Sequence, residues 1–297
     1  MNLNYLNPLF YVRPLGSRGF LNWMSDEVYL KLCYRSYFHK KLNLDNPKTY
    51  NEKMQWMKLY DRNPLYCTLV DKVAVREYVA EHVGQEYLIP MVGGPWEKPE
   101  DIDFDTLPQQ FVLKCNHGST TNIICKDKSK LNVEKVQAKL RKWLNTSWYW
   151  YGREWPYKDM KPLIYAEKYM EDAAVGELRD YKFFCFSGKP EIVMINTDRA
   201  DSSKQTHADF FDMDYNHLPF HKKHPNAPVV PEKPQNFEEM KALAAKMSAD
   251  LPAIRIDLYD VNGKIYFGEY TLYSASGFGP FHPEEWDEKI GAMIPLP

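Results

Sequence analysis

The sequence predicts an α+β protein in which helices come first and antiparallel strands follow. Residues 1–85 carry helix signals without an alternating strand–helix pattern, so a full Rossmann-like domain is not expected. Segments 180–195 and 254–272 read as hairpins with turns at Ser187-Gly188 and Asn262-Gly263. At 297 residues the chain can bury a large core and hold two or three subdomains.

Helix signals recur through the first 85 residues. Ser25 can begin a helix that runs through Tyr37, and Thr49-Tyr-Asn-Glu52 resembles a capping box. A third helix is expected from Asp71 to Val83, ended by Gly84.

The character of the sequence changes after Pro90, where strand signals begin. Residues 200–235 are polar, rich in His and Pro, and read as a long excursion or flap. The other expected elements are strands at Phe111–Cys115, Ile123–Lys126 and Leu163–Met170, an amphipathic helix at Asn132–Leu144, and a helix at Phe237–Leu251 capped by Asn236.

Composition excludes several classes of protein. A net charge of -2 argues against a nucleic-acid binder, and 44% hydrophobic residues with 26% charged ones are typical of a globular protein. The five cysteines have no CxxC spacing, so a disulfide framework or a cysteine zinc site is not expected. No signal peptide or membrane helix is evident. A cytoplasmic protein is expected, with peripheral membrane association left open.

The last hairpin carries paired acidic residues. A two-residue loop at Asn262-Gly263 would pair Asp257 with Gly268 and turn Glu269 to the opposite face. A three-residue loop that includes Val261 would instead group Arg255, Asp257, Glu269 and Thr271 on one face. We favour the second register because it separates charge from apolar surface. Two carboxylates on paired strands can hold a hard cation against an anionic ligand, whereas an exposed hairpin with ordinary surface charges is the alternative.

Strand lysines supply candidate partners for such an anion. Lys114 precedes a polar loop, 116–122, whose N–H groups and hydroxyls can face a phosphate, although an ordinary hairpin loop fits the same pattern. Lys182 lies on the opposite strand face from Tyr181 and Phe183, and is either a phosphate ligand or an edge residue. Arg199 adds a further positive charge.

Two other patterns have simpler interpretations. His217, His221 and His224, with His207 nearby, resemble a zinc-ligand spacing, but a solvated flap is favoured because no firm helix or close cysteine supports them. The aromatic run from Trp143 to Tyr157 can stack on sugars, although packing between subdomains is favoured.

Taken in order, five segments resemble the ATP-grasp superfamily and specifically its TupA-like branch of bacterial surface-polysaccharide synthesis. They are Asn51–Tyr60, Asp71-Lys72, Phe111–Ser119, Ile164–Met170 with Asp180-Tyr-Lys182, and the last hairpin through Gly277-Phe278. The resemblance implies a helical region (1–85), a small ATP-grasp lobe (86–170) and a large lobe with the metal-binding hairpin (171–297).

The resemblance also implies the roles of site residues. ATP would meet Lys72, Lys114, His117, Ser119 and Lys182, with Glu167, Tyr169 and Met170 at the adenine hinge. Asp257, Glu269 and Thr271 would hold Mg²⁺, although Thr271 stands where many ATP-grasp enzymes carry Asn. Arg255, Lys182 and Arg199 are the catalytic candidates. Arg255, Arg199 or Lys204 would hold the substrate carboxylate.

The activity implied is that of an ATP-dependent carboxylate–amine ligase that works through an acyl-phosphate. Its expected substrates are a uronic-acid carboxylate of a capsular or other surface polysaccharide, or its precursor, and an amine or amino acid. A metal-dependent glycosyltransferase-like enzyme is the alternative, and a non-catalytic carbohydrate-binding protein is the third class.

Overall fold

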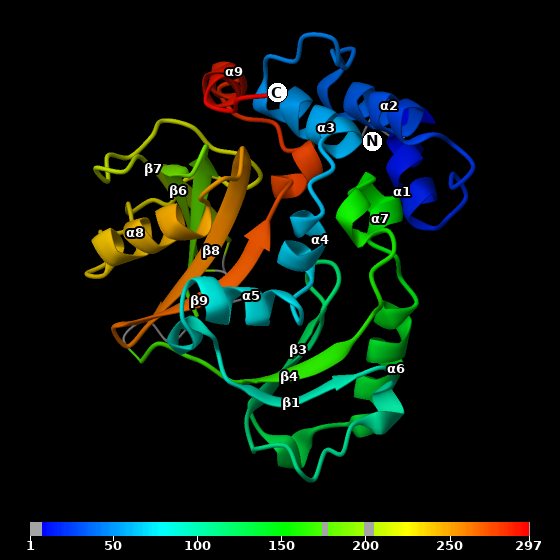
Figure 1. Cartoon of the computed structure of the whole chain (residues 1–297), viewed down its shortest axis with the longest axis vertical. Coiled ribbons are helices and arrows are strands. Elements are labelled where there is room, and N and C mark those ends of the chain that lie inside the picture. Colours follow the sequence, from blue (N-terminus) through cyan, green and yellow to red (C-terminus); the bar gives the residue numbers. More distant parts are fainter. Residues whose placement is uncertain (1–7, 174–177, 199–204, 297) are drawn as a thin grey trace.

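The computed structural model describes residues 8–173, 178–198 and 205–296, which form two sheets with helices around them (Figure 1). The first sheet has the order β1 (Met91–Trp96), β4 (Ile164–Lys168), β2 (Phe111–Cys115), β3 (Asn122–Cys125). The second has the order β7 (His207–Phe211), β6 (Lys189–Thr197), β5 (Asp180–Phe186), β8 (Ala253–Val261), β9 (Lys264–Thr271). All pairings between these strands are antiparallel, which confirms the α+β class.

The N-terminal region is helical, as expected. Ser25 accepts a hydrogen bond from the Val28 N–H and caps the second helix, while Thr49 and Glu52 form a complete capping box. The helices of this region are α1 (Val12–Ser17), α2 (Asp26–Phe38), α3 (Tyr50–Tyr60), α4 (Leu65–Val70) and α5 (Val75–His82).

The helix expected at residues 71–83 is shorter than predicted. The Asp71 carboxylate accepts hydrogen bonds from the N–H groups of Val73 (2.8 Å) and Ala74 (3.2 Å), and this local turn delays the helix until Val75. The turn separates α4 from α5. Both helices lie between the two sheets in Figure 1, so Lys72, in the turn, is close to both.

The small sheet packs one face against α6 (Val133–Leu144). Phe111, Leu113 and Cys115 of β2 are buried in a cluster with residues of α6. Because side chains alternate along a strand, Lys114 points to the opposite face, toward the large sheet. Strand β1 was not expected from the sequence; it contains two glycines and a proline, and its pairing with β4 is irregular.

The large sheet buries both faces. On one side the Phe183 ring lies 5.9 Å from that of Phe237, in α8 (Phe237–Met247). On the other, the Phe184 ring lies 6.5 Å from Tyr50 of α3. Lys182 shares the Phe184 face. The last helix, α9 (Glu285–Ala292), packs beside α3 at the top of Figure 1.

The polar segment 200–235, which we expected to be a long flap, contains a strand of the large sheet. Its residues 207–211 form β7, which pairs with β6 and buries Phe210 and Phe211. The sequence did not predict this strand because the two phenylalanines are flanked by polar residues, Asp209 and Asp212 among them. The connection from Asp212 to Asn236 follows and carries several of the histidines.

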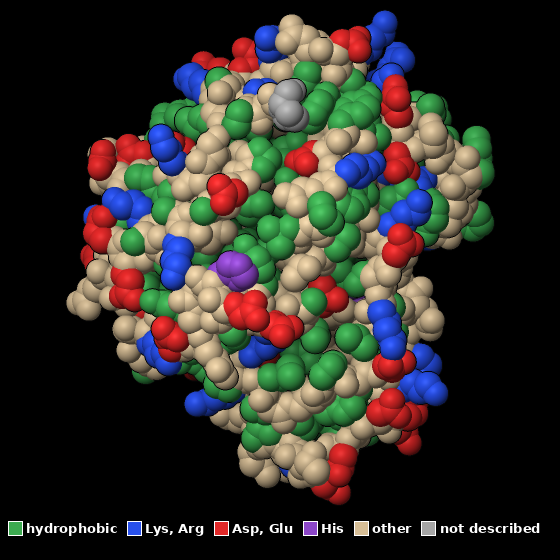
Figure 2. All heavy atoms as spheres, in the orientation of Figure 1, with side chains coloured by type: hydrophobic (Ala, Val, Ile, Leu, Met, Phe, Trp, Pro, Cys, Tyr) green, Lys and Arg blue, Asp and Glu red, His purple; other side chains and the backbone are tan. Residues whose placement is uncertain are grey.

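The aromatic segment around α7 (Tyr149–Gly152) packs within the protein, as favoured. Tyr149 donates a hydrogen bond to Asp26 of α2 (2.7 Å), and the Arg13 guanidinium lies 3.9 Å from the centroid of the Tyr151 ring. The face in Figure 2 intersperses acidic and basic side chains rather than gathering one sign. Within the described ranges, no helix has the length and apolar character needed to cross a bilayer.

Candidate active site

The loop of the last hairpin has two residues, so our prediction of a three-residue loop is wrong. Val261 pairs directly with Lys264, which leaves Asn262 and Gly263 as the loop. Their φ angles of 52° and 78° are typical of a type I′ turn, whose twist matches that of the two strands.

A bulge nevertheless brings the predicted side chains to one face. The register shifts between Asp257 and the next residue, leaving Gly268 as the extra residue in β9. Asp257 therefore pairs with Glu269, and Arg255 pairs with Thr271. Glycine is required at the bulge, because a Cβ on Gly268 would lie 2.9 Å from the Asp257 carbonyl oxygen.

Arg255 contacts both carboxylates of this face. Its Nε and Nη2 donate to the Asp257 carboxylate at 2.6 and 2.8 Å. Nη2 also reaches Thr271 Oγ1 (3.0 Å) and Glu269 (3.4 Å), and Nη1 donates to Ser274 Oγ (3.1 Å). One guanidinium thus orients both carboxylates and the start of the following loop.

Lys182 approaches the same carboxylate from the neighbouring strand. It pairs in register with Asp257, bonds to its Oδ2, and lies 3.2 Å from Asp180. Asp257 is 1% exposed. Burial alone would raise the pKa of Asp257, but Arg255 and Lys182 outweigh burial and hold that pKa below its ordinary value.

Lys72 connects the two sheets at Glu269. Its ammonium lies 3.4 Å from the Glu269 carboxylate and donates to the Gly118 carbonyl (2.8 Å) in the loop after β2. Burial would raise the pKa of Glu269, but the positive charges, Lys72 foremost, leave the pKa lowered. The predicted phosphate loop and the predicted metal hairpin therefore meet through one lysine.

Glu167, on the small sheet, forms ion pairs with two cations. It is 6% exposed and contacts Lys114 at 2.5 Å and Arg76 at 3.0 Å. Arg76 also donates to the Ile89 carbonyl (2.6 Å). Arg76 was missed in the sequence, where nothing distinguishes it from an ordinary helix-surface arginine. The small cavity beside it, about 10 Å³, is about the size of one water molecule and is lined by residues of both sheets, Glu167 and Glu269 among them.

Other predicted nucleotide residues lie around this cluster without joining it. The His117 ring is buried and bonds to the Trp143 carbonyl (3.0 Å), and burial lowers its pKa. Ser119 is exposed in the loop. Tyr169 and Met170 are half-buried just beyond β4, and Tyr169 bonds to Glu171. Of the remaining candidates, Arg199 and Lys204 lie outside the described residues.

The acidic pair fits Mg²⁺ by its chemistry. Mg²⁺ is usually bound by one or two carboxylates together with water and phosphate oxygens, and Asp257 and Glu269 are paired carboxylates with the Thr271 hydroxyl beside them. In this structure their oxygens bond to Lys72, Lys182 and Arg255. Within the described ranges no three His, Cys, Asp or Glu residues gather into a metal-binding group, so a metal here would need ligand or water oxygens as well.

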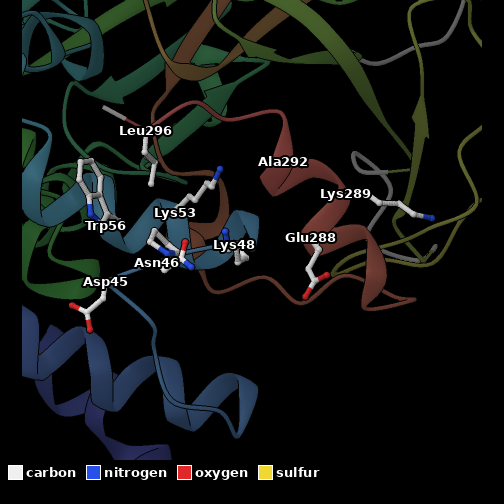
Figure 3. Close-up of a pocket in the computed structure, with 10 residues that line it drawn as sticks. Asp45, Asn46, Lys48, Lys53, Trp56, Glu288, Lys289, Ala292 and Leu296 are labelled. Carbon is white, nitrogen blue, oxygen red and sulfur yellow. The ribbon is translucent and has the colours of Figure 1, made fainter.

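A much larger cavity lies elsewhere in the part of the chain that the structure describes. It measures about 770 Å³ and opens between α3, α9 and the loop before α3 (Figure 3). Lys48, Lys53 and Trp56 line it, and its wall contains none of the predicted nucleotide or metal residues. Chemistry rather than volume therefore identifies the candidate active site.

Comparisons with known proteins agree with the sequence segments. The model of the TupA-like ATP-grasp family matches residues 52–295. Similar solved structures include a D-alanine–D-alanine ligase from Bacillus anthracis, with 16% identity, a TM-score of 0.38, and coverage of 69% of this chain and 57% of that one. They also include N5-carboxyaminoimidazole synthetase from Staphylococcus aureus, with 13% identity, a TM-score of 0.41, and coverage of 77% and 53%.

The chain spans little more than half the length of these two solved proteins. No curated protein matches it in sequence. The family match covers most of the chain and includes Lys72, Lys114, Lys182 and the whole β8–β9 hairpin. The chain belongs to the TupA-like ATP-grasp family.

Proposed function

We propose that the protein is an ATP-dependent carboxylate–amine ligase. The observation that carries the proposal is the pair Asp257 and Glu269, set opposite each other and bonded to Lys72, Lys182 and Arg255. Carboxylates that could bind a metal ion, beside several cations, suit a nucleoside triphosphate. Membership of the ATP-grasp family supports ATP as that nucleotide.

The cations would change partners when the nucleotide binds. Asp257 and Glu269 would hold Mg²⁺, which supplies charge neutralisation to the phosphates when bound. Lys72 and Lys182, no longer needed by the carboxylates, could then donate to phosphate oxygens. On the other sheet Lys114 could do the same after leaving Glu167. The long lysine stems allow such movements.

The proposed chemistry proceeds in two transfers. A substrate carboxylate oxygen attacks the γ-phosphorus of ATP, the bond to the ADP oxygen breaks, and an acyl-phosphate forms. An amine nitrogen then attacks the acyl carbon, phosphate leaves, and the nitrogen loses a proton. No side-chain nucleophile is needed, because positioning and charge stabilisation suffice. Arg255 and Lys182, which both contact Asp257, would stabilise the charge on the transferred phosphoryl group.

The finer proposal concerns substrates and place of action. We propose a uronic-acid carboxylate of a capsular or other surface polysaccharide, or its precursor, as the acid, and an amino acid or other amine as its partner. The TupA-like resemblance supports this choice of polymer. Since ATP and activated sugars are used there, we place the reaction in the cytoplasm.

Nucleotide turnover tests the proposal. The protein is incubated with ATP, Mg²⁺ and pairs of uronic acids and amines, and ADP and phosphate are measured together. We expect equal amounts of both products, released only when acid and amine are present. Absence of ATP binding by calorimetry would refute the ATP-grasp activity. Release of UDP or GDP from sugar nucleotides would instead support a glycosyltransferase.

A further inference from the structure

Lys222 places a buried ammonium group beside the candidate active site. It lies in the connection after β7, where its Nζ is shielded from solvent although the residue as a whole is half-buried. The Nζ lies 4.0 Å from the Phe281 ring centroid and 5.0 Å from that of Tyr50. Among the described residues it has no hydrogen-bond partner.

This lack of a partner distinguishes Lys222 from the other cations around the site. Each of the others contacts a carboxylate within 3.4 Å. Burying a charge without a hydrogen-bonded counter-ion is costly, and contacts with ring faces offset only part of that cost. The paired cations are Lys72 with Glu269, Arg76 and Lys114 with Glu167, Lys182 with Asp257 and Asp180, and Arg255 with Asp257.

A short chain of contacts connects Lys222 to Arg255. Tyr50, whose ring faces the lysine, lies close enough to Ser274 for that residue to lower the Tyr50 pKa, and Ser274 Oγ accepts from Arg255 Nη1 at 3.1 Å. The loop that starts at Ser274 continues past Gly279. A Cβ on Gly279 would lie 3.0 Å from Lys222 Cε and 3.3 Å from its Nζ. Lys222 therefore lies against the loop that follows the metal hairpin.

We propose that Lys222 binds the carboxylate of the acid substrate. The inference rests on the proposed ligase function and adds a residue that neither sequence motifs nor family resemblance had assigned. A carboxylate carries a single charge, which one lysine can balance, whereas the proposed phosphate site already has Lys72, Lys114, Lys182 and Arg255 around it. The four-carbon stem lets the ammonium move out from the two rings toward the loop.

The protonation of Lys222 agrees with a site that awaits an anion. Burial lowers the pKa of Lys222 to about 7; the Asp287 charge opposes that shift and the Arg255 charge adds to it. Tyr50, which also faces the lysine, has its pKa raised, so it is uncharged at neutral pH. A carboxylate that binds Lys222 favours the charged ammonium, and binding should therefore take up a proton.

The first experiment observes Lys222 directly with acetate as the carboxylate probe. The side-chain Nζ and Cε resonances of lysines are recorded in the isotope-labelled protein, and the Lys222 signal is assigned by its loss in Lys222→Met. We expect a saturable acetate-dependent shift and a raised pKa of Lys222, beyond the effect of chloride at equal ionic strength. No such shift would overturn the proposal, as would a response to phosphate or ATP but not to acetate.

The second experiment compares neighbouring lysines. Lys222→Met should weaken acetate binding about 10- to 100-fold, measured by acetate-dependent melting temperature, because a charge-assisted contact is lost. The exposed Lys223→Met is the matched control and should behave as wild type. Lys222→Arg keeps the charge and guards against a folding defect, since it should retain acetate binding.

Calorimetry with ATP separates this inference from the function it rests on. Lys222→Met should bind ATP within about twofold of wild type. If its ATP affinity falls tenfold or more, Lys222 belongs to the nucleotide site and the proposal is wrong. If wild type binds acetate at Lys222 but no ATP, the ligase function fails while the carboxylate site stands.

Discussion

Replacing Asp257 by Asn removes one charge from the most completely buried carboxylate of the candidate site. The side chain keeps its shape, and its surroundings keep two cations. Arg255 donates to this carboxylate at 2.6 and 2.8 Å, and Lys182 bonds to it from β5. An amide nitrogen cannot accept from either cation, so at least one buried donor loses its acceptor.

The expected cost follows from that burial. Removing one partner of a buried ion pair costs about 3–5 kcal/mol, because the other charge stays uncompensated. An unfolding entropy of about 2.1 cal/mol/K per residue, over the 297 residues, is about 0.6 kcal/mol/K. Asp257→Asn is therefore expected to lower the melting temperature by about 5–8 °C.

Thermal unfolding of wild type, Asp257→Asn and Asp260→Asn provides the assay. Asp260 lies on the same strand but is half-buried and accepts from the neutral Asn236 amide, at 3.3 Å, rather than from a buried cation, so its replacement should cost less than about 1 kcal/mol. Equal melting temperatures for the two variants would refute the reasoning. The double variant Asp257→Asn with Lys182→Met should recover stability relative to Asp257→Asn alone, because the orphaned ammonium is gone.

The pH dependence of the Asp257 contribution has a definite sign. The folded-state pKa of Asp257 lies below its ordinary value of 3.8, so the folded protein binds this proton less readily than the unfolded chain. The stabilisation is complete above that ordinary value and is lost as pH falls through the lower folded-state pKa. The difference between wild type and Asp257→Asn should therefore shrink in acid below about pH 4.

Three further substitutions test other parts of the structure. The stability advantage of wild type over Lys222→Met should grow by about 2 kcal/mol from pH 7 to pH 9 in urea unfolding, because the unfolded chain keeps a proton up to about pH 10.5 and the folded one only to about pH 7; a constant difference would contradict this. Gly277→Ala should cost about 1–3 kcal/mol by thermal unfolding, since φ is +63° and the new methyl would lie 2.4 Å from a glutamine nitrogen. Gly263→Ala, equally left-handed but with no atom within 4 Å, should cost less, and the reverse order would disprove the steric argument. Lys58→Met should cost about 3 kcal/mol or more in the same assay, because four buried oxygens lose a donor, whereas Lys31→Met at the surface should stay within about 0.5 kcal/mol; similar losses would refute this explanation.

For the β8–β9 hairpin, the sequence predicted correctly which side chains share a face but predicted the wrong loop length. Separation of polar from apolar positions predicted that Asp257 and Glu269 share a face, and they do. We assigned the necessary shift to a longer turn, whereas the structure places it at Gly268. A glycine inside a strand is itself a bulge signal, and a turn of Asn262-Gly263 is already complete with two residues.

Capping and burial patterns were the most predictable features because they depend on short sequence separations. Ser25 and Thr49 each accept a hydrogen bond from an N–H three residues ahead, as their sequence contexts indicated, and Asn132 does so as well. The cap expected from Asn236 is wrong, because its side chain donates to Asp260 and makes no capping hydrogen bond to α8. Strands β1 and β7 could not be predicted in the same way. Their residues have little alternation, and pairing with β4 and β6, supplied by distant parts of the chain, determines their conformation.

Ion-pair partners were the feature least predictable from local sequence. Glu167 meets Arg76 across 91 positions, and Lys182 meets Asp257 across 75. Whether a given lysine has a counter-ion therefore follows from strand register and helix placement rather than from its neighbours in the chain. Lys222 illustrates the point, because nothing adjacent to it in sequence marks it apart from Lys223, yet folding buries the ammonium of one and leaves the other exposed. Most buried charges are paired, and departures from such rules concentrate at functional sites. An uncompensated ammonium against the loop that follows the β8–β9 hairpin thus directs attention to a negatively charged ligand, which only the folded arrangement could indicate.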